Sequence, residues 1–409
     1  MKSTAHLVDL PFPVEANCLL VGGILLGRLA ERAGQTPFYA YDRGLITARV
    51  AELRTALPKD IHLHYAIKSN PMPAVVQHLA GLVDGFDVAS GGELKTALDT
   101  TMPPARISFA GPGKSERELR QAAAADIVVN LESEREMELL AQIGASMGLR
   151  PKAAIRVNPD FELKNAGMKM SGGPKPFGVD AERLPVMLER MKALSLEFYG
   201  FHIFSGSQSL KAESIMEALE KTFELARGLA AYAPSPVKLL NLGGGFGIPY
   251  FPGDQPLDLA RVGEHLNSLM PAARQDFPEA EFVIELGRYI VGEAGIYVSR
   301  VIDRKLSRGL IFLVVDGGLH HHLSASGNFG QVIRKNYRVL VGNRVVPESV
   351  ETASVVGPLC TPLDVLADKM DLGHAQEGDL IVVLQSGAYG LTASPRGFLS
   401  HPDAVEILV

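Results

Sequence analysis

Cysteine is scarce in this sequence, which has only Cys18 and Cys360 among its 409 residues. Two cysteines cannot form the disulfide framework of a small secreted protein. Their scarcity is typical of proteins in a reducing compartment, and we therefore expect a cytoplasmic location.

Long apolar stretches and an excess of positive charge are also missing. The apolar run that starts at Cys18 is interrupted by Gly22 and Gly23 and ends before Arg28. It is far shorter than the ~20 residues of a membrane-spanning helix. The first residues, MKSTAHLVDLPF, lack the apolar region and cleavage site of a signal peptide. With 40 basic and 46 acidic residues the net charge is −6. We therefore expect neither a membrane nor a nucleic acid as partner.

The sequence does contain a long alternation of strand-like and helix-like segments. Eight β-rich runs, most of them followed by a helix-like stretch, cover residues 62–67, 85–90, 106–111, 126–131, 152–158, 196–204, 237–245 and 281–287. Parallel strands need such crossovers, and eight units over about 250 residues match the size of a (β/α)8 barrel. The predicted fold class is α/β, with a TIM-like barrel at residues 38–288. A doubly wound open sheet is the alternative, because periodicity does not show closure.

The pattern changes from Tyr289 onward, where strand-like runs are separated by turns. This predicts a C-terminal β domain, either a sandwich or a barrel. The run CLLVGGILL near the N-terminus could add a strand to it. We therefore expect a β domain made of residues 1–37 and 289–409.

Polar residues stand at the ends of several predicted barrel strands, where barrel enzymes have their active sites. Lys68 follows YAI at such an end, and a partly desolvated amine there can form a Schiff base. The glycine-rich run 243–247 lets backbone N–H groups approach an anion. His202 with Ser205, in HIFSGSQ, and Glu285 with Arg288, in ELGR, are further candidates; each also has an ordinary structural interpretation.

The predicted β domain contains two further patterns. GPLCTPLD includes Cys360 and Asp364, although a lone cysteine is most often a small buried apolar residue. Three consecutive histidines occupy 320–322. Adjacent side chains on a strand point in opposite directions, so these three cannot easily share one ion, and we expect no metal. Taken together, the candidates at the barrel strand ends suit a phosphate-bearing aldehyde cofactor, pyridoxal phosphate.

The ordered motifs resemble a known family over nearly the whole chain. They are GQTPFYAYD, YAIKSNP, GFDVASGGEL, ISFAGPGKS, RVNP, HIFSGSQ, NLGGGFGIPY, ELGRYIVG, VDGG, GPLCTPLD and SGAYG. The chain is similar to the pyridoxal-phosphate decarboxylases of the diaminopimelate and ornithine decarboxylase group, which have the alanine-racemase type of barrel. Within it, the pattern is closest to the decarboxylase of a glutamyl group tethered to an acyl carrier protein in butirosin biosynthesis, and to exosortase-associated relatives.

The resemblance implies roles for the matching residues. Lys68 would hold the cofactor covalently, His202 would stack on its ring, and Glu285 would pair with the protonated ring nitrogen. The remaining cofactor contacts would be Asp87 and Arg156 behind the ring, and Ser205, Gly244, Gly245, Tyr389 and Arg288 at or near the phosphate. Cys360 would protonate the reacting carbon in the site of a partner subunit. Lys68, His202 and Cys360 would thus be the catalytic residues of a homodimer with shared active sites.

One departure from the family pattern concerns the substrate. Members that act on diamino substrates commonly have an acidic residue directly after the cysteine, but this chain has Thr361. The segment 319–337 also lacks the usual arginine-bearing pattern of diaminopimelate decarboxylases. A buried ammonium without a partner is strongly disfavoured. We therefore expect a small-molecule or carrier-protein-tethered amino acid whose far end is neutral.

Substrate contacts are expected from Arg288, Thr361, Asp364 and Tyr389. Asp364 or a residue of 319–337 is an alternative source of the missing charge. A true diaminopimelate, ornithine or lysine decarboxylase therefore stays open. An amino-acid racemase also stays open, although racemases of this type usually place an arginine where Glu285 stands. A non-catalytic cofactor-binding protein is a further alternative, and the β domain and Cys360 argue against it.

Overall fold

The computed structural model describes residues 10–162, 164, 167–329, 331 and 334–409. These residues form two compact units. The first comprises Arg49–Ile248 and Gln255–Tyr289. The second comprises the described residues up to Ala48 together with Pro249–Asp254 and Ile290–Val409.

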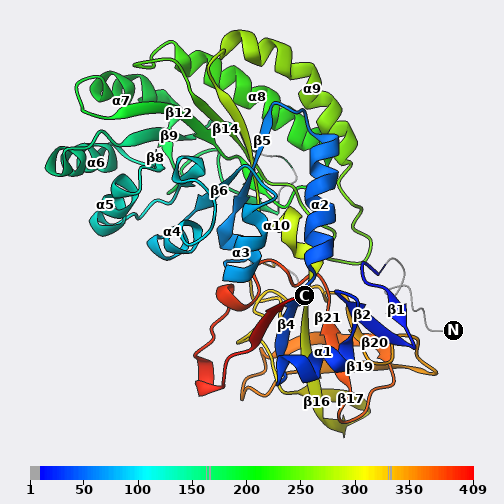
Figure 1. Ribbon diagram of the computed structural model, residues 1–409. Helices are drawn as coiled ribbons and strands as arrows, with labels where there is room; N and C mark the ends of the chain where they lie inside the picture. Colours follow the sequence, from blue (N-terminus) through cyan, green and yellow to red (C-terminus); the bar gives the residue numbers. More distant parts are fainter. Residues whose placement is uncertain (1–9, 163, 165–166, 330, 332–333) are drawn as a thin grey trace. The chain divides into compact units, whose positions relative to one another are not determined.

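The first unit is built on a closed barrel of parallel strands (Figure 1). In spatial order its strands are β9 (Lys152–Asn158), β12 (Glu197–Ile203), β14 (Leu239–Gly244), β15 (Glu281–Leu286), β5 (Ile61–Ala66), β6 (Gly85–Val88), β7 (Ile107–Phe109) and β8 (Val128–Leu131). The sheet closes because β8 also pairs with β9. The predicted (β/α)8 barrel is therefore confirmed, and the doubly wound open sheet is excluded. All eight runs identified in the sequence are barrel strands.

Helices lie on the outside of these strands, as Figure 1 shows. They are α2 (Arg43–Ala56), α3 (Pro73–Ala80), α4 (Gly91–Leu98), α5 (Glu116–Ala124), α6 (Glu134–Met147), α7 (Leu184–Met191), α8 (Ala212–Ala230), α9 (Leu259–Asp276) and the short α10 (Arg288–Val291). Three shorter strands complete the unit: β10 (Met168–Lys169) pairs with β13 (Gly206–Ser207), and β11 (Val179–Asp180) pairs with β9. Helices outside and side chains inside bury both faces of the barrel, which is why β8 and β6 are buried at every position.

Serine residues start three consecutive barrel helices directly after their strands. Ser90, Ser115 and Ser133 each accept a hydrogen bond from the backbone N–H three residues later, at the start of α4, α5 and α6. At α5 the Glu118 side chain returns the contact and completes a capping box. These caps fix the turns at the C-terminal end of the barrel, where the candidate site lies.

The second unit contains a mixed β sheet (Figure 1). Its strands are β18 (Val339–Val341), β21 (Leu380–Val383), β16 (Gly295–Ser307), β17 (Leu310–Val315), β19 (Val350–Val356), β20 (Val365–Gly373), β4 (Phe38–Tyr41) and β22 (Val405–Leu408). The long strand β16 pairs with β4 and β21 in its first half and with β17 in its second half. The predicted C-terminal β domain is confirmed.

The N-terminal segment contributes to the second unit in two ways. A separate three-stranded sheet contains β1 (Val14–Glu15), β2 (Cys18–Val21) and β3 (Ile24–Leu25), and the helix α1 (Leu26–Ala33) follows it. Leu19 and Val21 share one apolar core with Phe38, Ile296 and Val382. The strand Phe38–Tyr41 falls within the range 38–288 that the sequence assigned to the barrel, but it pairs with β16 and β22 in the mixed sheet.

Candidate active site

Lys68 lies at the C-terminal end of β5, on a short 3₁₀ turn (Ile67–Ser69) that follows the strand. Its flanking residues Ile67 and Ser69 are buried, whereas the lysine side chain is 43% exposed. The Nζ atom lies 3.5 Å from Glu285 Oε1 and 5.6 Å from the centre of the Phe204 ring. The amine is thus held beside a carboxylate while its other side can be reached from the barrel mouth.

Glu285 is a buried carboxylate near the end of β15. His202 Nε2 lies 3.1 Å from Glu285 Oε2, the oxygen that does not face Lys68. Burial alone would raise the pKa of Glu285, but the Lys68 ammonium, the adjacent His202 imidazole and the Arg156 guanidinium outweigh it. The pKa is therefore well below its usual range, and Glu285 is ionised at neutral pH.

Strand pairing brings these residues together at the C-terminal end of the barrel. His202 on β12 is paired with Arg156 on β9 and with Asn241 on β14. Asn241 is in turn paired with Val283 on β15, two residues before Glu285. His202 and Arg156 are thus direct neighbours on adjacent strands, and Glu285 lies slightly further along its strand, with its carboxylate 3.1 Å from the His202 ring. Barrel enzymes have their active sites at this end of the strands.

A buried network of charges holds Arg156 in place. Arg156 Nη1 donates to Glu132 Oε1 at 2.9 Å, and its guanidinium carbon lies 5.1 Å from the centre of the Phe177 ring. The backbone N–H groups of Gly111 and Gly178 also donate to Glu132. Burial would raise the pKa of Glu132, but the positive charges of Arg156 and Lys114 together with these hydrogen bonds lower it.

Lys114 and Glu136 complete this network on the side away from Arg156. Lys114 Nζ lies 2.8 Å from Glu136 Oε1, and both side chains are almost fully buried. Glu136 Oε2 in turn accepts the backbone N–H of Glu132 at 2.7 Å. The sequence reasoning missed Glu132, Lys114 and Glu136. In the sequence, only the position of these three residues after the strands β7 and β8 marks them as candidates. Charged residues at such positions are equally typical of an ordinary helix start.

Asp87 lies at the end of β6 inside the barrel. Its Oδ1 accepts a short hydrogen bond from Ser108, and its Oδ2 lies 3.4 Å from His64 Nδ1. Asn130 donates to the Ser108 hydroxyl at 3.1 Å. The contacts of Asp87 are therefore with neighbouring strands β5 and β7, and its support of a cofactor ring stays a prediction.

The glycine-rich turn after β14 has the backbone geometry of an anion cradle. Gly243 and Gly245 have φ angles of 71° and 84°, which other residues rarely adopt. A Cβ on Gly244 would lie 1.9 Å from the backbone oxygen of Glu285. In the described part of the chain the N–H groups of Gly245 and Phe246 donate to no acceptor. Two adjacent N–H groups of this kind can bind a phosphate.

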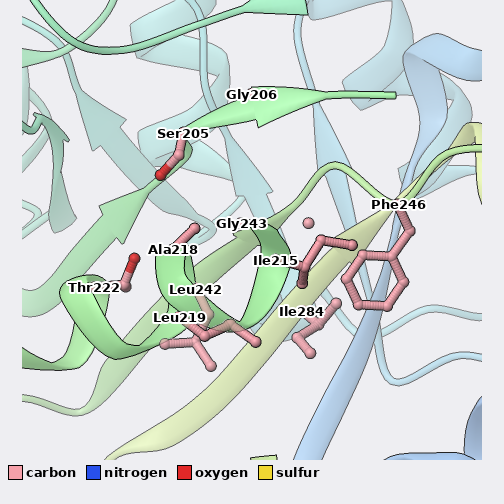
Figure 2. A pocket seen from close by; sticks show the side chains of 11 residues that line it. Ser205, Gly206, Ile215, Ala218, Leu219, Thr222, Leu242, Gly243, Phe246 and Ile284 are labelled. Carbon is pink, nitrogen blue, oxygen red and sulfur yellow. The ribbon is translucent and has the colours of Figure 1, made fainter. Parts of the chain in front are cut away.

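A small cavity lies behind this turn, between α8 and the end of β14 (Figure 2). Ile215, Leu219 and Ile284 form its apolar walls, and the hydroxyls of Ser205 and Thr222 line it as well. Its volume of about 20 Å³ is enough for roughly one water molecule. The cavity is therefore too small for an amino acid, and Ser205 is placed next to the glycine-rich turn as predicted.

Two other hollows of the first unit lie away from these residues. One of about 460 Å³ is lined by Arg106, Lys238 and Glu281, at the N-terminal ends of barrel strands. Another of about 710 Å³ lies between residues 160–162 with Lys164 and the helix α8. Barrel enzymes use the opposite end of the strands from the first hollow, and the second hollow is lined by none of the predicted site residues, so neither indicates the site. Arg288 begins α10 directly after β15 and is half-buried.

The second unit carries the other predicted site residues. Cys360 and Thr361 lie on the loop 357–364 between β19 and β20, and the Cys360 side chain is exposed. Asp364 ends the same loop and is buried, 2% exposed. Tyr389 lies in the turn after β21 with a φ of 53°, and its ring centre is 6.5 Å from that of Phe329. Their expected contacts with substrate and cofactor stay predictions.

Asp364, the alternative source of charge for the substrate, is hydrogen-bonded within its own unit. Its Oδ1 accepts the backbone N–H of Leu319 at 2.6 Å, and its Oδ2 accepts that of Leu359 at 2.8 Å. Both oxygens are thus engaged within the second unit. The other alternative, residues 319–337, includes positions 330, 332 and 333, which lie outside the described residues.

The three consecutive histidines are buried and point to different partners. His321 Nε2 donates to the backbone oxygen of Pro402 at 2.8 Å, and His322 Nε2 lies 2.9 Å from Ser386 Oγ. The His320 ring is tilted by 42° against that of His321, with centres 3.7 Å apart. Burial lowers the pKa of His322 to about 3 and, with its neighbours His321 and His401, that of His320 to about 4. Among the residues that the structure describes, no cluster of His, Cys, Asp and Glu could hold a metal ion.

The barrel residues fit pyridoxal phosphate. Lys68 supplies an amine for the aldehyde, ionised Glu285 can keep a ring nitrogen protonated, and the turn at Gly245 offers backbone donors to a phosphate. Both ring nitrogens of His202 are buried without a hydrogen-bond partner, which suits an imidazole that packs against another ring.

Comparison with known proteins agrees with this geometry. Residues 43–292 match the family model of the pyridoxal-dependent decarboxylase, pyridoxal binding domain. The chain is 36% identical to the L-glutamyl-[BtrI acyl-carrier protein] decarboxylase of Niallia circulans, over 91% of this chain and 89% of the relative. It is 35% identical to the diaminopimelate decarboxylase of Aquifex aeolicus, over 96% of this chain and 90% of that relative.

A solved structure from Aquifex aeolicus, AQ1208, has a similar fold, with a TM-score of 0.85 and 32% identity over 97% of this chain and 92% of the other. No helix in the described part of the chain is long and apolar enough to cross a membrane. From its motifs, its barrel and these matches, the chain belongs to the family of pyridoxal-dependent decarboxylases.

Proposed function

We propose that this protein decarboxylates an amino acid whose far end is neutral or tethered to a carrier protein, with a glutamyl thioester as the leading substrate. The family supplies the reaction class and pyridoxal phosphate as cofactor. The observation that carries the substrate proposal is the loop after β19. There Thr361 follows Cys360, and the nearby carboxylate of Asp364 is occupied by two backbone N–H groups.

In this proposal the barrel residues bind and orient the cofactor. Lys68 Nζ holds it covalently, Glu285 keeps a proton on the ring nitrogen, and His202 packs on the ring. Ser205, Gly244 and Gly245 hold the phosphate, with Tyr389 and Arg288 at or near it, while Asp87 and Arg156 support the ring. When bound, pyridoxal phosphate supplies a conjugated ring that delocalises the electron pair left behind as the carboxylate departs as carbon dioxide.

The last proton transfer falls to Cys360. Loss of carbon dioxide leaves an electron pair on the α-carbon, and one proton must be added there to give the amine product. The exposed Cys360 thiol is the proposed donor, reaching the site of a partner subunit, and solvent then returns the proton to the sulfur. This makes the protein a homodimer with shared active sites. Both cysteines are free, in keeping with a cytoplasmic location.

The neutral far end follows from the chemistry of Thr361. A site that binds a buried ammonium needs a charged or strongly accepting partner for it. Without that partner, kcat/KM for the ammonium-bearing substrate can fall by several orders of magnitude. A threonine hydroxyl can donate to a thioester or amide carbonyl and can also accept. It therefore suits a glutamyl thioester better than lysine, ornithine or meso-diaminopimelate.

A residue swap at this position tests the substrate proposal. Thr361→Asp should raise the activity on lysine relative to that on the glutamyl carrier-protein thioester by about tenfold or more. Thr361→Val keeps the size and the branching but adds no charge, and it should give no such gain. An unchanged preference in Thr361→Asp, with the cofactor bound as in the wild type, would contradict the role of Thr361.

Release of carbon dioxide tests the reaction class itself. The wild-type enzyme should release labelled carbon dioxide from the preferred carboxyl-labelled substrate and leave the corresponding amine. Retention of the label with loss of optical activity would instead indicate a racemase. An ionised Glu285 favours decarboxylation, because it keeps the ring nitrogen protonated and the ring a strong electron acceptor.

A further inference from the structure

Asp364 links two loops of the second unit that each carry a motif noted in the sequence. The loop 357–364 contains Cys360 and Thr361, and the turn 315–318 contains VDGG. One oxygen of the Asp364 carboxylate accepts the N–H of Leu319, directly after VDGG, at 2.6 Å. The other accepts the N–H of Leu359, directly before Cys360, at 2.8 Å. A single side chain therefore fixes the cysteine loop to its neighbour.

The backbone of Asp364 closes the same loop from within. Its N–H donates to the carbonyl oxygen of Thr361 at 3.3 Å, and its carbonyl oxygen accepts the N–H of Gly357 at 3.0 Å. The N–H of Thr361 donates to the carbonyl oxygen of Leu359 at 2.7 Å. These backbone hydrogen bonds on both sides of Cys360 therefore involve Asp364 itself or Leu359 and Thr361, which Asp364 contacts.

Two glycines leave room for this carboxylate. A Cβ on Gly318 would lie 2.1 Å from Asp364 Oδ1, and a Cβ on Gly357 would lie 2.3 Å from Oδ2. Heavy atoms cannot approach so closely, so any larger residue at either position would displace the carboxylate. Gly318 of VDGG and Gly357 of GPLC are therefore explained by the same contact, although they are 39 positions apart in the chain.

A buried carboxylate is a costly way to anchor a loop, because desolvation disfavours its charge. Burial raises the pKa of Asp364, and the hydrogen bonds from Leu319 and Leu359 only partly oppose it. Two directed hydrogen bonds specify the position of a loop more tightly than apolar packing does. Such precision is useful where the loop carries a reactive side chain, and the exposed Cys360 is that side chain.

We propose that Asp364 is a positioning residue, which sets where the Cys360 thiol and the Thr361 hydroxyl stand, and that it does not contact the substrate. This inference rests on the proposed function, in which these two groups act on the substrate. It also argues against Asp364 as the partner of a distal ammonium, because its carboxylate is 2% exposed and is directed at two backbone N–H groups.

The reactivity of the Cys360 thiol tests this proposal without any turnover. In Asp364→Asn the amide can accept only one of the two N–H groups, and the other donor is left unpaired. Alkylation of Cys360 by iodoacetamide in the cofactor-loaded protein, followed by peptide mapping, should become about tenfold faster. Cys18 in the same sample is the internal reference and should react at its wild-type rate. Asp368→Asn, a neutralised exposed carboxylate on β20, is the matched control.

The glycines give a second route if Asp364→Asn does not fold. Gly318→Ala and Gly357→Ala should each accelerate alkylation of Cys360, whereas Gly397→Ala should not, because no atom lies within 4 Å of the added Cβ there. Decarboxylation by the Asp364 and glycine variants should fall by about 100-fold in kcat, while the absorbance of the cofactor bound at Lys68 stays unchanged.

These readouts separate the two proposals. A wild-type protein without decarboxylase activity would refute the proposed function, but the alkylation rates would still report whether Asp364 fixes the loop. Wild-type alkylation rates in Asp364→Asn and in both glycine variants would overturn the positioning role, whatever the activity of the enzyme.

Discussion

The charge state of Glu285 depends on Lys68 and His202. The Lys68 ammonium, 3.5 Å away, and the His202 ring, 3.1 Å away, favour the ionised form of this buried carboxylate, and Glu285 in turn lies beside the lysine amine. If Lys68 held pyridoxal phosphate as proposed, its nitrogen would be bound to the aldehyde carbon, and Glu285 would be available to pair with a protonated ring nitrogen. Glu285 would then have a positively charged neighbour both without and with the cofactor.

Replacement of Lys68 tests the covalent attachment. Lys68→Ala should lose the cofactor absorbance that survives dialysis, and decarboxylation should fall by about 10³-fold or more, since the amine is the attachment point. Borohydride treatment of the wild type followed by peptide mapping should find the label on Lys68. Lys95→Ala, which removes a lysine exposed on α4, should behave like the wild type. Full turnover in Lys68→Ala would contradict the assignment.

At the scale of elements, the turns after β7 and β8 are fixed by the buried network of Glu132, Arg156, Lys114 and Glu136. Glu132 accepts hydrogen bonds from Gly111, Gly178 and Arg156, so it joins three segments of the barrel mouth. A buried ion pair adds little compared with apolar packing, but the loss of one partner leaves a buried charge uncompensated. The network therefore makes these turns sensitive to single substitutions.

Glu132→Gln should accordingly lower the free energy of unfolding by about 3 kcal/mol at neutral pH. Glu138→Gln, which breaks an exposed pair with Arg190, should change it by less than about 1 kcal/mol. The folded state lowers the pKa of Glu132, so its contribution is present above the unfolded value of about 4.3 and is lost as the pH falls through the folded pKa. Urea unfolding at pH 7 and pH 3 should show the difference between wild type and Glu132→Gln shrinking in acid.

The sequence predicts the barrel well because its strands are buried on both faces and read as continuous apolar runs. All eight predicted runs are barrel strands, and the candidates Lys68, His202 and Glu285 meet at one end of them. The strand β20 has a weak signal in the sequence because its centre, DKMD, lies at the edge of the sheet, where Asp368 and Lys369 are exposed. The N-terminal run, which could add a strand to the β domain, belongs to that unit but forms a small sheet of its own, and Phe38–Tyr41 joins the mixed sheet instead.

Contacts between segments distant in the sequence were beyond prediction from single motifs. Glu132 and Lys114 look like ordinary helix starts in the sequence, but in the structure Arg156 of β9 pairs with Glu132, and Glu136 pairs with Lys114. In the sequence, Asp364 looks like a free carboxylate near Cys360. In the structure it accepts a hydrogen bond from the backbone N–H of Leu319, which is 45 residues earlier in the chain. In both cases the role of the residue depends on which two segments lie next to each other in the fold. A single sequence does not show which distant segments are in contact.

At the scale of the whole molecule, the predicted site residues are divided between the two compact units. The barrel unit holds Lys68, His202 and Glu285, and the other unit holds Cys360 and Thr361. The proposed homodimer would account for this division, because the loop 357–364 of one subunit, which carries Cys360, would complete the barrel site of its partner. Activity would then depend on assembly as well as on folding.

Mixed dimers test this shared site. Lys68→Ala and Cys360→Ala are each expected to be nearly inactive alone. After unfolding and refolding together, heterodimers should regain one intact site, which corresponds to about a quarter of wild-type activity if subunits pair at random. Differently tagged subunits allow the heterodimer to be isolated. Isolated heterodimers with no more activity than either parent would rule out a shared site.

The most direct measurement compares kcat/KM of the wild-type enzyme for a glutamyl carrier-protein thioester, lysine, ornithine and meso-diaminopimelate under the same conditions. With Thr361 after the cysteine and Asp364 engaged by Leu319 and Leu359, no described residue of the loop 357–364 offers a charge to a distal ammonium. The thioester should therefore be the preferred substrate, with the diamino acids weak or inactive. A kcat/KM of about 10⁴ M⁻¹s⁻¹ or above for a diamino acid, with no preference for the thioester, would contradict the account.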